Sequence, residues 1–212
     1  MHPTSGGEVR PNECERENQS VRGSLQNNVV FTGGLPIRFR EDRRSQGRLP
    51  STKDFLMIIR EYQERDAAAL RRCVVVLQDS ERAIDPLLLA GEDMADRYCE
   101  RIHARCRETL GQIYVAEEDS LVVGFTTVLA REPFTELDDP PGHYALITDL
   151  VVLEPYRGRG IGRQLLERAE TYAKQAGATE LRIGVLANNG TARRLYLDAG
   201  FQPHLEVLNK RW

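Results

Sequence analysis

The sequence is poor in cysteine, and its few cysteines are not arranged to cross-link a fold or hold a metal. Four occur among 212 residues, and no two of them form a Cys-x-x-Cys pair. A small disulfide scaffold and a structural zinc site both need closely spaced cysteines. The spacing therefore excludes both classes, and we expect no bound metal.

Long hydrophobic runs and a strong net charge are also missing. No stretch approaches the ~18 consecutive apolar residues of a membrane-spanning helix, and residues 1–18 contain no apolar core of a signal peptide. Lys and Arg number 29 against 32 Asp and Glu, which gives a formal charge of −3. Binders of nucleic acid or acidic membranes typically carry a basic excess. We therefore expect a cytoplasmic protein with neither kind of partner.

What the sequence does contain is enough apolar residue for one packed domain, at 41% hydrophobic and 29% charged. The composition changes near residue 53. Residues 1–52 are rich in Gly, Pro, Ser, Asn, Gln and Arg, and such a segment buries too little surface to offset the entropy of ordering it. We predict a disordered extension over residues 1–52 and a single domain over residues 53–212. Met57 opens the first strand pattern, so the alternative that the chain starts there stays open.

Hydrophobic periodicity after residue 53 predicts strands and helices in the order β-α-α-β-β-β-α-β-α-β. The predicted strands cover residues 55–60, 112–117, 121–130, 144–153, 181–187 and 201–208. The predicted helices begin near Asp66, Asp93, Ile161 and Asn189. Hairpin strands followed by a β-α-β unit imply an α/β fold, with a mixed sheet covered by helices.

A glycine-rich loop lies between the apolar strand that ends near residue 153 and the next helix. Three glycines in five residues allow the backbone to approach a ligand closely, and the helix that follows offers its unpaired N–H groups and positive dipole end. Such a junction binds phosphate or pyrophosphate. The loop and its flanking cations are Arg157, Gly158, Arg159, Gly160, Ile161, Gly162 and Arg163.

Two common phosphate-binding motifs do not match this loop. No Lys-Ser or Lys-Thr pair follows it, as a Walker A loop requires, and the third glycine of a Rossmann fingerprint is not at the required spacing. The loop instead matches Arg-x-x-Gly-x-Gly, and a second block, from Asn189 to Phe201, reads Asn-x-x-Ala-x-x-Leu-Tyr-x-x-x-Gly-Phe. Together these motifs resemble the GNAT superfamily of acyl-CoA N-acyltransferases, over residues 56–208.

The resemblance implies a GNAT fold and acetyl-CoA as co-substrate. In that fold the central sheet is mixed but mostly antiparallel, and two splayed strands hold the cofactor. The glycine loop would bind the pyrophosphate, and the Asn189 side chain would also contact the cofactor, although Asn189 can equally be a helix cap. The strand segment Leu150, Val151 and Val152 would offer its backbone to the pantetheine arm and the thioester carbonyl.

The resemblance also implies that Tyr196 is the general acid that protonates the departing thiolate, since a phenol stays protonated at neutral pH. The alternative for Tyr196 is a buried aromatic on a helix face. Asp149 is the best candidate base because burial in an apolar strand raises a carboxyl pKa, but a hydrogen-bonded structural carboxylate is an equal alternative. Glu117 and Tyr144 are weaker candidates, and we expect His103 and His143 to be exposed.

The resemblance therefore implies an N-acetyltransferase that acetylates a primary amine by direct attack in a ternary complex. A small-molecule amine is favoured over a protein, because Gly184 stands where relatives that modify ribosomal proteins carry Glu. Acidic residues between 79 and 93 allow a cationic amine or polyamine, or are simply a solvated loop. The alternative functions are a non-catalytic acyl-CoA-binding regulator and, less well supported, a nucleotide-binding protein. A homodimer is compatible with each.

Overall fold

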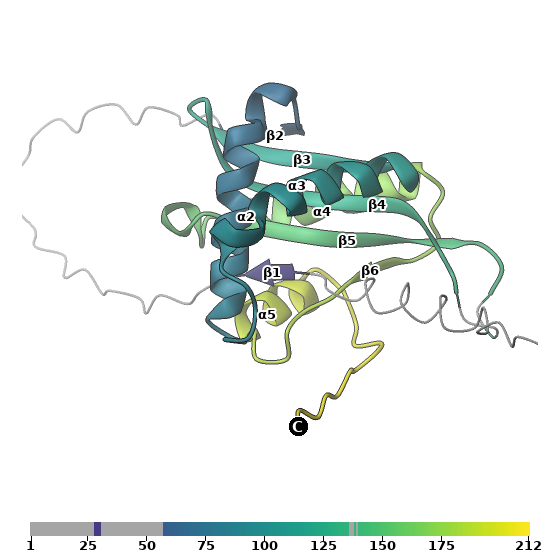
Figure 1. Cartoon of the computed structure of the whole chain (residues 1–212). Helices are drawn as coiled ribbons and strands as arrows, with labels where there is room; N and C mark the ends of the chain where they lie inside the picture. Colours follow the sequence, from purple (N-terminus) through teal and green to yellow (C-terminus); the bar gives the residue numbers. More distant parts are fainter. Residues whose placement is uncertain (1–27, 31–56, 136–137, 139) are drawn as a thin grey trace, which may run out of the picture.

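The computed structural model describes residues 28–30, 57–135, 138 and 140–212, and its elements are labelled in Figure 1. Of the extension predicted to be disordered, only residues 28–30 are described, and they form a strand that the sequence did not predict. The remainder of that prediction lies outside the described residues.

The described residues form a six-stranded mixed sheet. Its strands are β1 (Asn28–Val30), β2 (Met57–Glu61), β3 (Gly111–Glu118), β4 (Leu121–Pro133), β5 (His143–Val152) and β6 (Leu181–Ile183). The strands lie in the order β1-β5-β4-β3-β2, with β6 also on β5. Pairing is antiparallel from β2 to β5, which confirms the predicted hairpins, and parallel where β1 and β6 meet β5.

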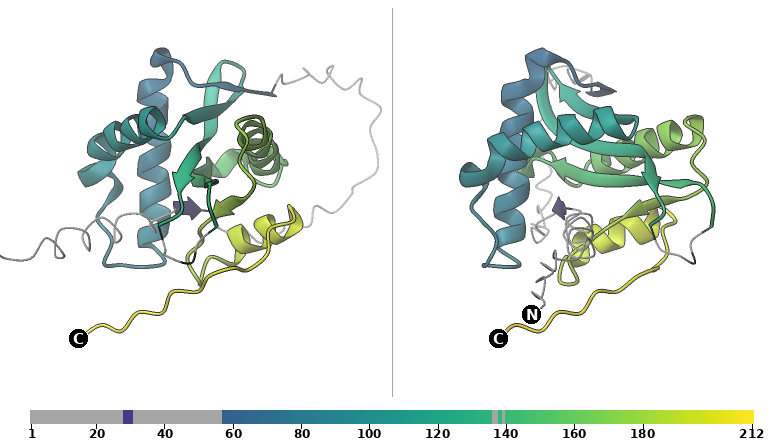
Figure 2. Two further views of the ribbon diagram at one scale, coloured as in Figure 1. Left: turned by 90° about the vertical axis from the view of Figure 1, so that its right-hand side faces the viewer. Right: turned by 45° about the vertical axis from the view of Figure 1, so that its right-hand side comes forward.

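Helices cover both faces of this sheet, as the paired cores show (Figure 2). Within the described residues the α-helices are α2 (Ala67–Arg82), α3 (Gly91–Glu108), α4 (Ile161–Gln175) and α5 (Gly190–Asp198). α2 and α3 pack on one face through residues such as Leu70, Leu77 and Ile102. α4 and α5 belong to the core on the other face, through residues such as Leu165 and Ala192. The helical spacing of apolar residues dictates this arrangement, because each helix buries one stripe against the sheet.

β5 is irregular at its centre. Its register with β4 passes from Thr127 opposite Asp149 to Val128 opposite Ile147, which leaves Thr148 as an extra residue. This is a β-bulge, a feature that redirects side chains and interrupts regular pairing. On the other edge of β5, β6 pairs with residues 145–147 and β1 with residues 149–151. The bulge therefore lies where one neighbouring strand ends and the other begins.

The C-terminal strand predicted over residues 201–208 is not formed. Residues 201–212 have no regular secondary structure, and Leu205 and Leu208 are 70% and 86% exposed. A strand needs a partner for its backbone and a face to bury, and β6 ends early at Ile183 instead of continuing to residue 187.

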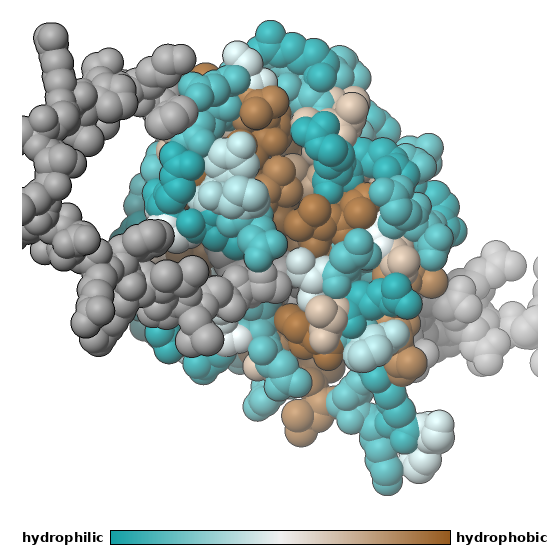
Figure 3. Space-filling view, turned by 90° about the vertical axis from the view of Figure 1, so that its left-hand side faces the viewer, coloured by the Kyte–Doolittle hydropathy of each residue, from teal (hydrophilic) through white to brown (hydrophobic). Residues whose placement is uncertain are grey.

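In the space-filling view, hydrophobic residues gather near the middle of the face, bordered by hydrophilic ones (Figure 3). None of the described helices is long and apolar enough to cross a membrane.

Candidate active site

The glycine loop joins β5 to α4 through the short 3-10 helix η2 (Glu154–Tyr156). Gly158 and Gly160 have φ values of 74° and 79°, which only glycine adopts readily. A Cβ at either position would meet no atom within 4 Å, so the surface above the loop is open. Gly160 precedes α4, and no side chain caps that helix. The first-turn amides of α4 are thus available to an anion.

An open groove of about 590 Å³ lies between this loop and α5, within the size range of ordinary ligand sites. Seven of the residues expected to bind the cofactor line it: Val152, Arg157, Gly158, Gly160, Ile161, Gly162 and Arg163. Tyr156, Gly190, Thr191, Arg194, Leu195 and Asp198 complete the lining. Three arginines against one aspartate make the groove cationic, which favours a phosphate-bearing ligand.

The arginines of the loop differ in their partners. Arg157 donates from Nε to the backbone oxygen of Val152 at 2.7 Å, and burial lowers its pKa. Arg163 forms an exposed ion pair with Glu167. Arg159 does not line the groove and instead forms an ion pair with the buried carboxylate of Glu118. A pyrophosphate contact by Arg159 would require it to leave Glu118, so Arg157 and Arg163 are better placed.

Three other predicted cofactor residues lie beside the groove but do not line it. Asn189 is 3% exposed and accepts a hydrogen bond from the Ala192 backbone N–H at 3.1 Å, which makes it the N-cap of α5. Leu150 and Val151 are buried, and in the strand register they stand opposite Val29 and Val30 of β1. The β5 edge predicted for the pantetheine arm is therefore paired with β1 in this structure.

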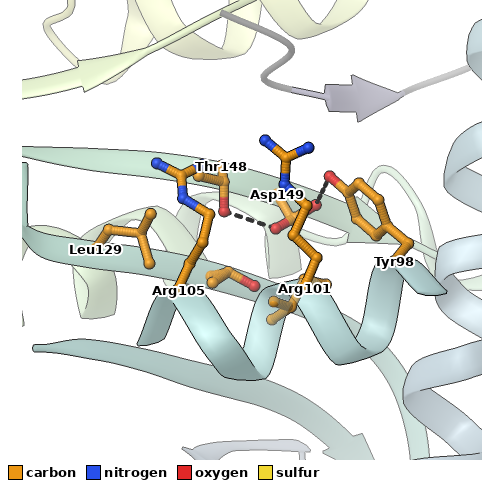
Figure 4. Close-up of a pocket in the computed structure, with 8 residues that line it drawn as sticks. Tyr98, Arg101, Arg105, Leu129, Thr148 and Asp149 are labelled. Atoms are coloured by element: carbon orange, nitrogen blue, oxygen red, sulfur yellow. Dashed lines mark hydrogen bonds between the residues drawn. The ribbon is translucent and has the colours of Figure 1, made fainter. Parts of the chain in front are cut away.

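Asp149 lies in a second, smaller pocket between β5 and α3 (Figure 4). Its side chain is fully buried and accepts hydrogen bonds from Tyr98 Oη and Thr148 Oγ1, both at 2.7 Å. Burial raises the Asp149 pKa. The hydrogen bonds from Tyr98 and Thr148, the neighbouring Thr127 side chain and the charge of Arg105 all lower the pKa and so limit this rise. Asp149 is thus both hydrogen-bonded and pocket-lining, and a raised pKa suits a group that accepts a proton.

Tyr196 lies on the opposite face of the sheet, in the core formed by α4 and α5. It is 3% exposed, and among the described residues its hydroxyl is buried without a hydrogen-bond partner. An unpaired buried hydroxyl costs about 1–3 kcal/mol. Burial, and secondarily the charge of Glu81, raises the Tyr196 pKa well above 10. The phenol therefore stays protonated at neutral pH.

The weaker base candidates have structural roles. Glu117 accepts a 2.7 Å hydrogen bond from Arg60 Nε, and Arg60 also forms an ion pair with Asp66 through Nη1. Tyr144 packs against Phe134, with ring centroids 5.2 Å apart. Neither residue lines the Asp149 pocket. His103 and His143 are half-buried rather than exposed, and His103 packs against Tyr62 at 5.2 Å between centroids.

Sequence reasoning missed several residues at the site. Tyr98, Arg101 and Arg105 of α3 line the Asp149 pocket. In the sequence, Tyr98 resembles an ordinary residue of the buried helix face, and the two arginines resemble ordinary surface residues of a helix. Their i, i+3, i+7 spacing was the available signal, since it places all three on one face. Glu81 was assigned to an acidic loop, yet it lies in the last turn of α2 and is 1% exposed. Its charge raises the pKa of both Tyr98 and Tyr196.

Comparison with known proteins identifies the family. Residues 66–201 match the model of the acetyltransferase (GNAT) family. YycN of Bacillus subtilis, described as an uncharacterized N-acetyltransferase, is 39% identical over 71 residues, 34% of this chain and 46% of its own length. The thialysine N-ε-acetyltransferase of Mus musculus is 27% identical over 148 residues, 68% of this chain and 83% of its own. The match to YycN thus spans less than half of that relative.

A solved structure has the same fold. It is a Clostridium acetobutylicum protein described as a predicted acetyltransferase and solved with acetyl-CoA. It superposes with a TM-score of 0.57 at 19% identity, covering 74% of this chain and 96% of its own. The chain belongs to the acetyltransferase (GNAT) family, and the resemblance and fold class inferred from its motifs are confirmed.

Proposed function

We propose that this protein is an acetyl-CoA-dependent N-acetyltransferase that acetylates the primary amine of a small molecule in a ternary complex. The observation that carries the proposal is the placement of Asp149 and Tyr196. The pocket of Asp149 opens between β5 and α3, whereas Tyr196 belongs to the core on the α4 and α5 face. A proton acceptor and a proton donor thus flank the same strand, and the cationic groove begins at its end.

The groove fits the phosphates of acetyl-CoA. Gly158 and Gly160 leave an open surface, the uncapped start of α4 offers backbone amides, and Arg157 and Arg163 add positive charge. When bound, acetyl-CoA would supply a thioester as the acetyl donor and a thiolate as the leaving group. The chain's task is to hold these parts still, because fixing both reactants makes the reaction effectively unimolecular.

Two side chains of the protein manage the protons. Asp149 takes a proton from the incoming ammonium group, which leaves a neutral amine able to attack the acetyl carbon. The new C–N bond forms as the C–S bond breaks, and Tyr196 Oη gives its proton to the sulfur. The second proton leaving the nitrogen passes to solvent, and a solvent proton restores the Tyr196 hydroxyl, so that the products are the amide, the CoA thiol and a protonated Asp149. Backbone N–H groups of β5 beyond the bulge at Thr148 would stabilise negative charge on the acetyl oxygen.

The Asp149 pocket has room for the amino group of the acceptor. Its enclosed volume is about 20 Å³, roughly the space of one water molecule or one ammonium group. A mouse relative acts on thialysine, by its description, which favours a small amine as the acceptor.

β1 lies on the β5 edge opposite residues 149–151, and binding of the pantetheine arm there requires β1 to move away.

Two measurements on the full chain test the proposal. Isothermal titration with CoA is expected to show binding, and thiol release from acetyl-CoA is expected to depend on an added amine from a panel of amino acids, polyamines, aminoglycosides and peptides. CoA binding without thiol release would instead support the alternative of a non-catalytic acyl-CoA-binding protein. Absence of CoA binding would contradict both, and binding of ATP or NAD in its place would favour a nucleotide-binding protein.

A further inference from the structure

The Asp149 pocket has two arginines at its entrance. Arg101 and Arg105 both line it and lie four residues apart on α3, which places them on one face of the helix. Figure 4 shows both side chains extending from α3 toward β5, to the level of Asp149 and Thr148. Arg101 is exposed and the Arg105 side chain is 21% exposed, so both guanidinium groups meet solvent at the pocket mouth.

The partners of Arg105 leave donors for a ligand. Arg105 forms an ion pair with Glu132 through a single nitrogen at 2.9 Å, whereas a guanidinium has five N–H donors. Its charge also acts on Asp149, where it opposes the dominant effect of burial. Arg101 likewise opposes the effect of burial on Tyr98. The lining of the pocket therefore carries two positively charged groups beside the buried carboxyl group of Asp149.

None of the acidic residues between 79 and 93 that favoured a cationic acceptor lines the Asp149 pocket. Asp79 accepts a hydrogen bond from the Gly91 backbone N–H at 2.8 Å, which fixes the start of α3. Asp85 forms an ion pair with Arg211 at 2.6 Å. Neither residue lines the Asp149 pocket. A polyamine would therefore meet the two arginines at the entrance instead of a row of carboxylates.

Pocket size decides which part of the acceptor meets the arginines. About 20 Å³ of enclosed space takes one amino group, so the remainder of the molecule extends outward past α3. Among the described residues that line the pocket, the charged groups besides Asp149 are the guanidinium groups of Arg101 and Arg105, which bind carboxylate and phosphonate groups through paired N–H donors.

We infer that the acceptor carries an acidic group, a carboxylate or a phosphonate, which Arg101 and Arg105 bind while the amine points toward Asp149. This inference rests on the proposed acetyl transfer and specifies its substrate class. The two arginines select the substrate and orient it, because an anchored acid fixes the direction of the amine. They take no part in proton transfer.

Matched acceptors test the inference, with kcat/KM measured by thiol release for lysine against cadaverine and for 3-aminopropylphosphonate against propylamine. The acid-bearing member of each pair is expected to be at least about 10-fold better, since a charge-assisted pair is worth ~1.5–3 kcal/mol. In Arg101→Met the ratio within each pair is expected to approach one. Arg105→Met is expected to lower the ratio in the same way. Arg105→Lys, which keeps the positive charge, is expected to retain part of the preference for the acid-bearing amine. Thermal unfolding of each variant verifies that it folds.

Arg107→Met is the matched control, because Arg107 is exposed on the same helix and does not line the pocket. It is expected to keep the ratio of the unchanged protein. Turnover with no preference for acid-bearing amines, or a preference that Arg101→Met leaves intact, would overturn the inference while acetyl transfer stands. Absence of turnover with every amine would overturn acetyl transfer itself, and the inference with it.

Discussion

Tyr98 Oη of α3 donates a hydrogen bond of 2.7 Å to Oδ1 of Asp149 on β5. This bond crosses from the helix layer to the sheet at the residue after the bulge. It connects the helix that carries Arg101 and Arg105 to the carboxyl group proposed as the base. The bond favours the ionised form of Asp149, whose pKa burial raises. The pH dependence of activity should therefore respond to Tyr98.

Tyr98→Phe is expected to shift the acidic limb of the kcat/KM profile to higher pH. A base acts only when deprotonated, so activity falls as pH drops through its pKa. Loss of a hydrogen bond to the carboxylate raises that pKa further, and the variant should lose activity at a higher pH than the unchanged protein. Tyr172→Phe is the control, since Tyr172 Oη donates to the Leu110 carbonyl, away from the pocket. Coincident profiles for all three proteins would contradict a role for Asp149 as base.

Asp149→Asn and Glu81→Gln separate the two buried carboxyl groups at the site. Asp149→Asn should lower kcat by about 100-fold or more, because only Asp149 lines the acceptor pocket. The loss of kcat in Glu81→Gln should be at least about 10-fold smaller than the loss in Asp149→Asn, since Glu81 acts on Tyr98 and Tyr196 only through its charge. Single-turnover rates at saturating acetyl-CoA measure both. If Glu81→Gln lowered kcat more than Asp149→Asn, Glu81 would be the better candidate for the general base.

Asp149→Asn should also keep or raise stability at pH 7. Because the folded pKa of Asp149 is raised, the folded state binds this proton more tightly than the unfolded state. Stability then declines as pH rises from the unfolded pKa through the folded one. Because Asn stays neutral, the variant should not show this decline in the free energy of unfolding. Urea denaturation at pH 4 and pH 7 measures the difference between the two proteins. A variant much less stable at pH 7 alone would show that the carboxylate stabilises the fold.

Tyr196→Phe should lower kcat by about 100-fold while the Kd of acetyl-CoA changes little. Phe keeps the ring that packs 6.0 Å from Phe201 and removes only the hydroxyl. That hydroxyl has no hydrogen-bond partner among the described residues, so the free energy of unfolding should hold or rise slightly. Isothermal titration and steady-state kinetics give the two quantities. Unchanged turnover would leave Tyr196 as a packed aromatic.

Gly160→Glu should abolish CoA binding. The new side chain would place negative charge at the open start of α4, and a non-glycine residue at a φ of 79° is strained. Gly177→Glu imposes similar strain at the C-terminal end of α4, where φ is 82° and the space is equally open. Gly177→Glu should therefore match the loss of stability but keep CoA affinity. Equal affinities in the two variants would remove the pyrophosphate site from the loop.

Deletion of residues 1–56 should lower the KM for acetyl-CoA. β1 stands opposite residues 149–151 of β5, on the backbone edge that the cofactor's pantetheine arm is proposed to use. Removing this competing strand should raise apparent affinity, because no binding energy is then spent on displacing it. Deletion of residues 1–27 retains β1 and serves as the control. Equal KM values for both truncated forms and the full chain would show that β1 does not compete.

Much of the fold could be predicted from local pattern. The apolar stripes of α2 and α4 report directly on which face of each helix is buried, and the apolar runs of β3 and β4 fit strands that are buried on both faces. The missing strand after Phe201 and the unpredicted β1 share a physical cause. Short strands depend on pairing with a neighbour. Residues 28–30 pair with β5, whereas β6 is only three residues long and residues 201–208 do not pair with it. No periodicity within either segment carries that information.

The sequence by itself determined the family and the glycine loop before α4, because these follow from motifs of contiguous residues. Only the tertiary structure decided which side chains meet. It brought Arg101 and Arg105 of α3 to the pocket of Asp149, turned Arg159 to Glu118 and set β1 along β5. These contacts join residues distant in the chain, and packing between layers, not local propensity, determines them.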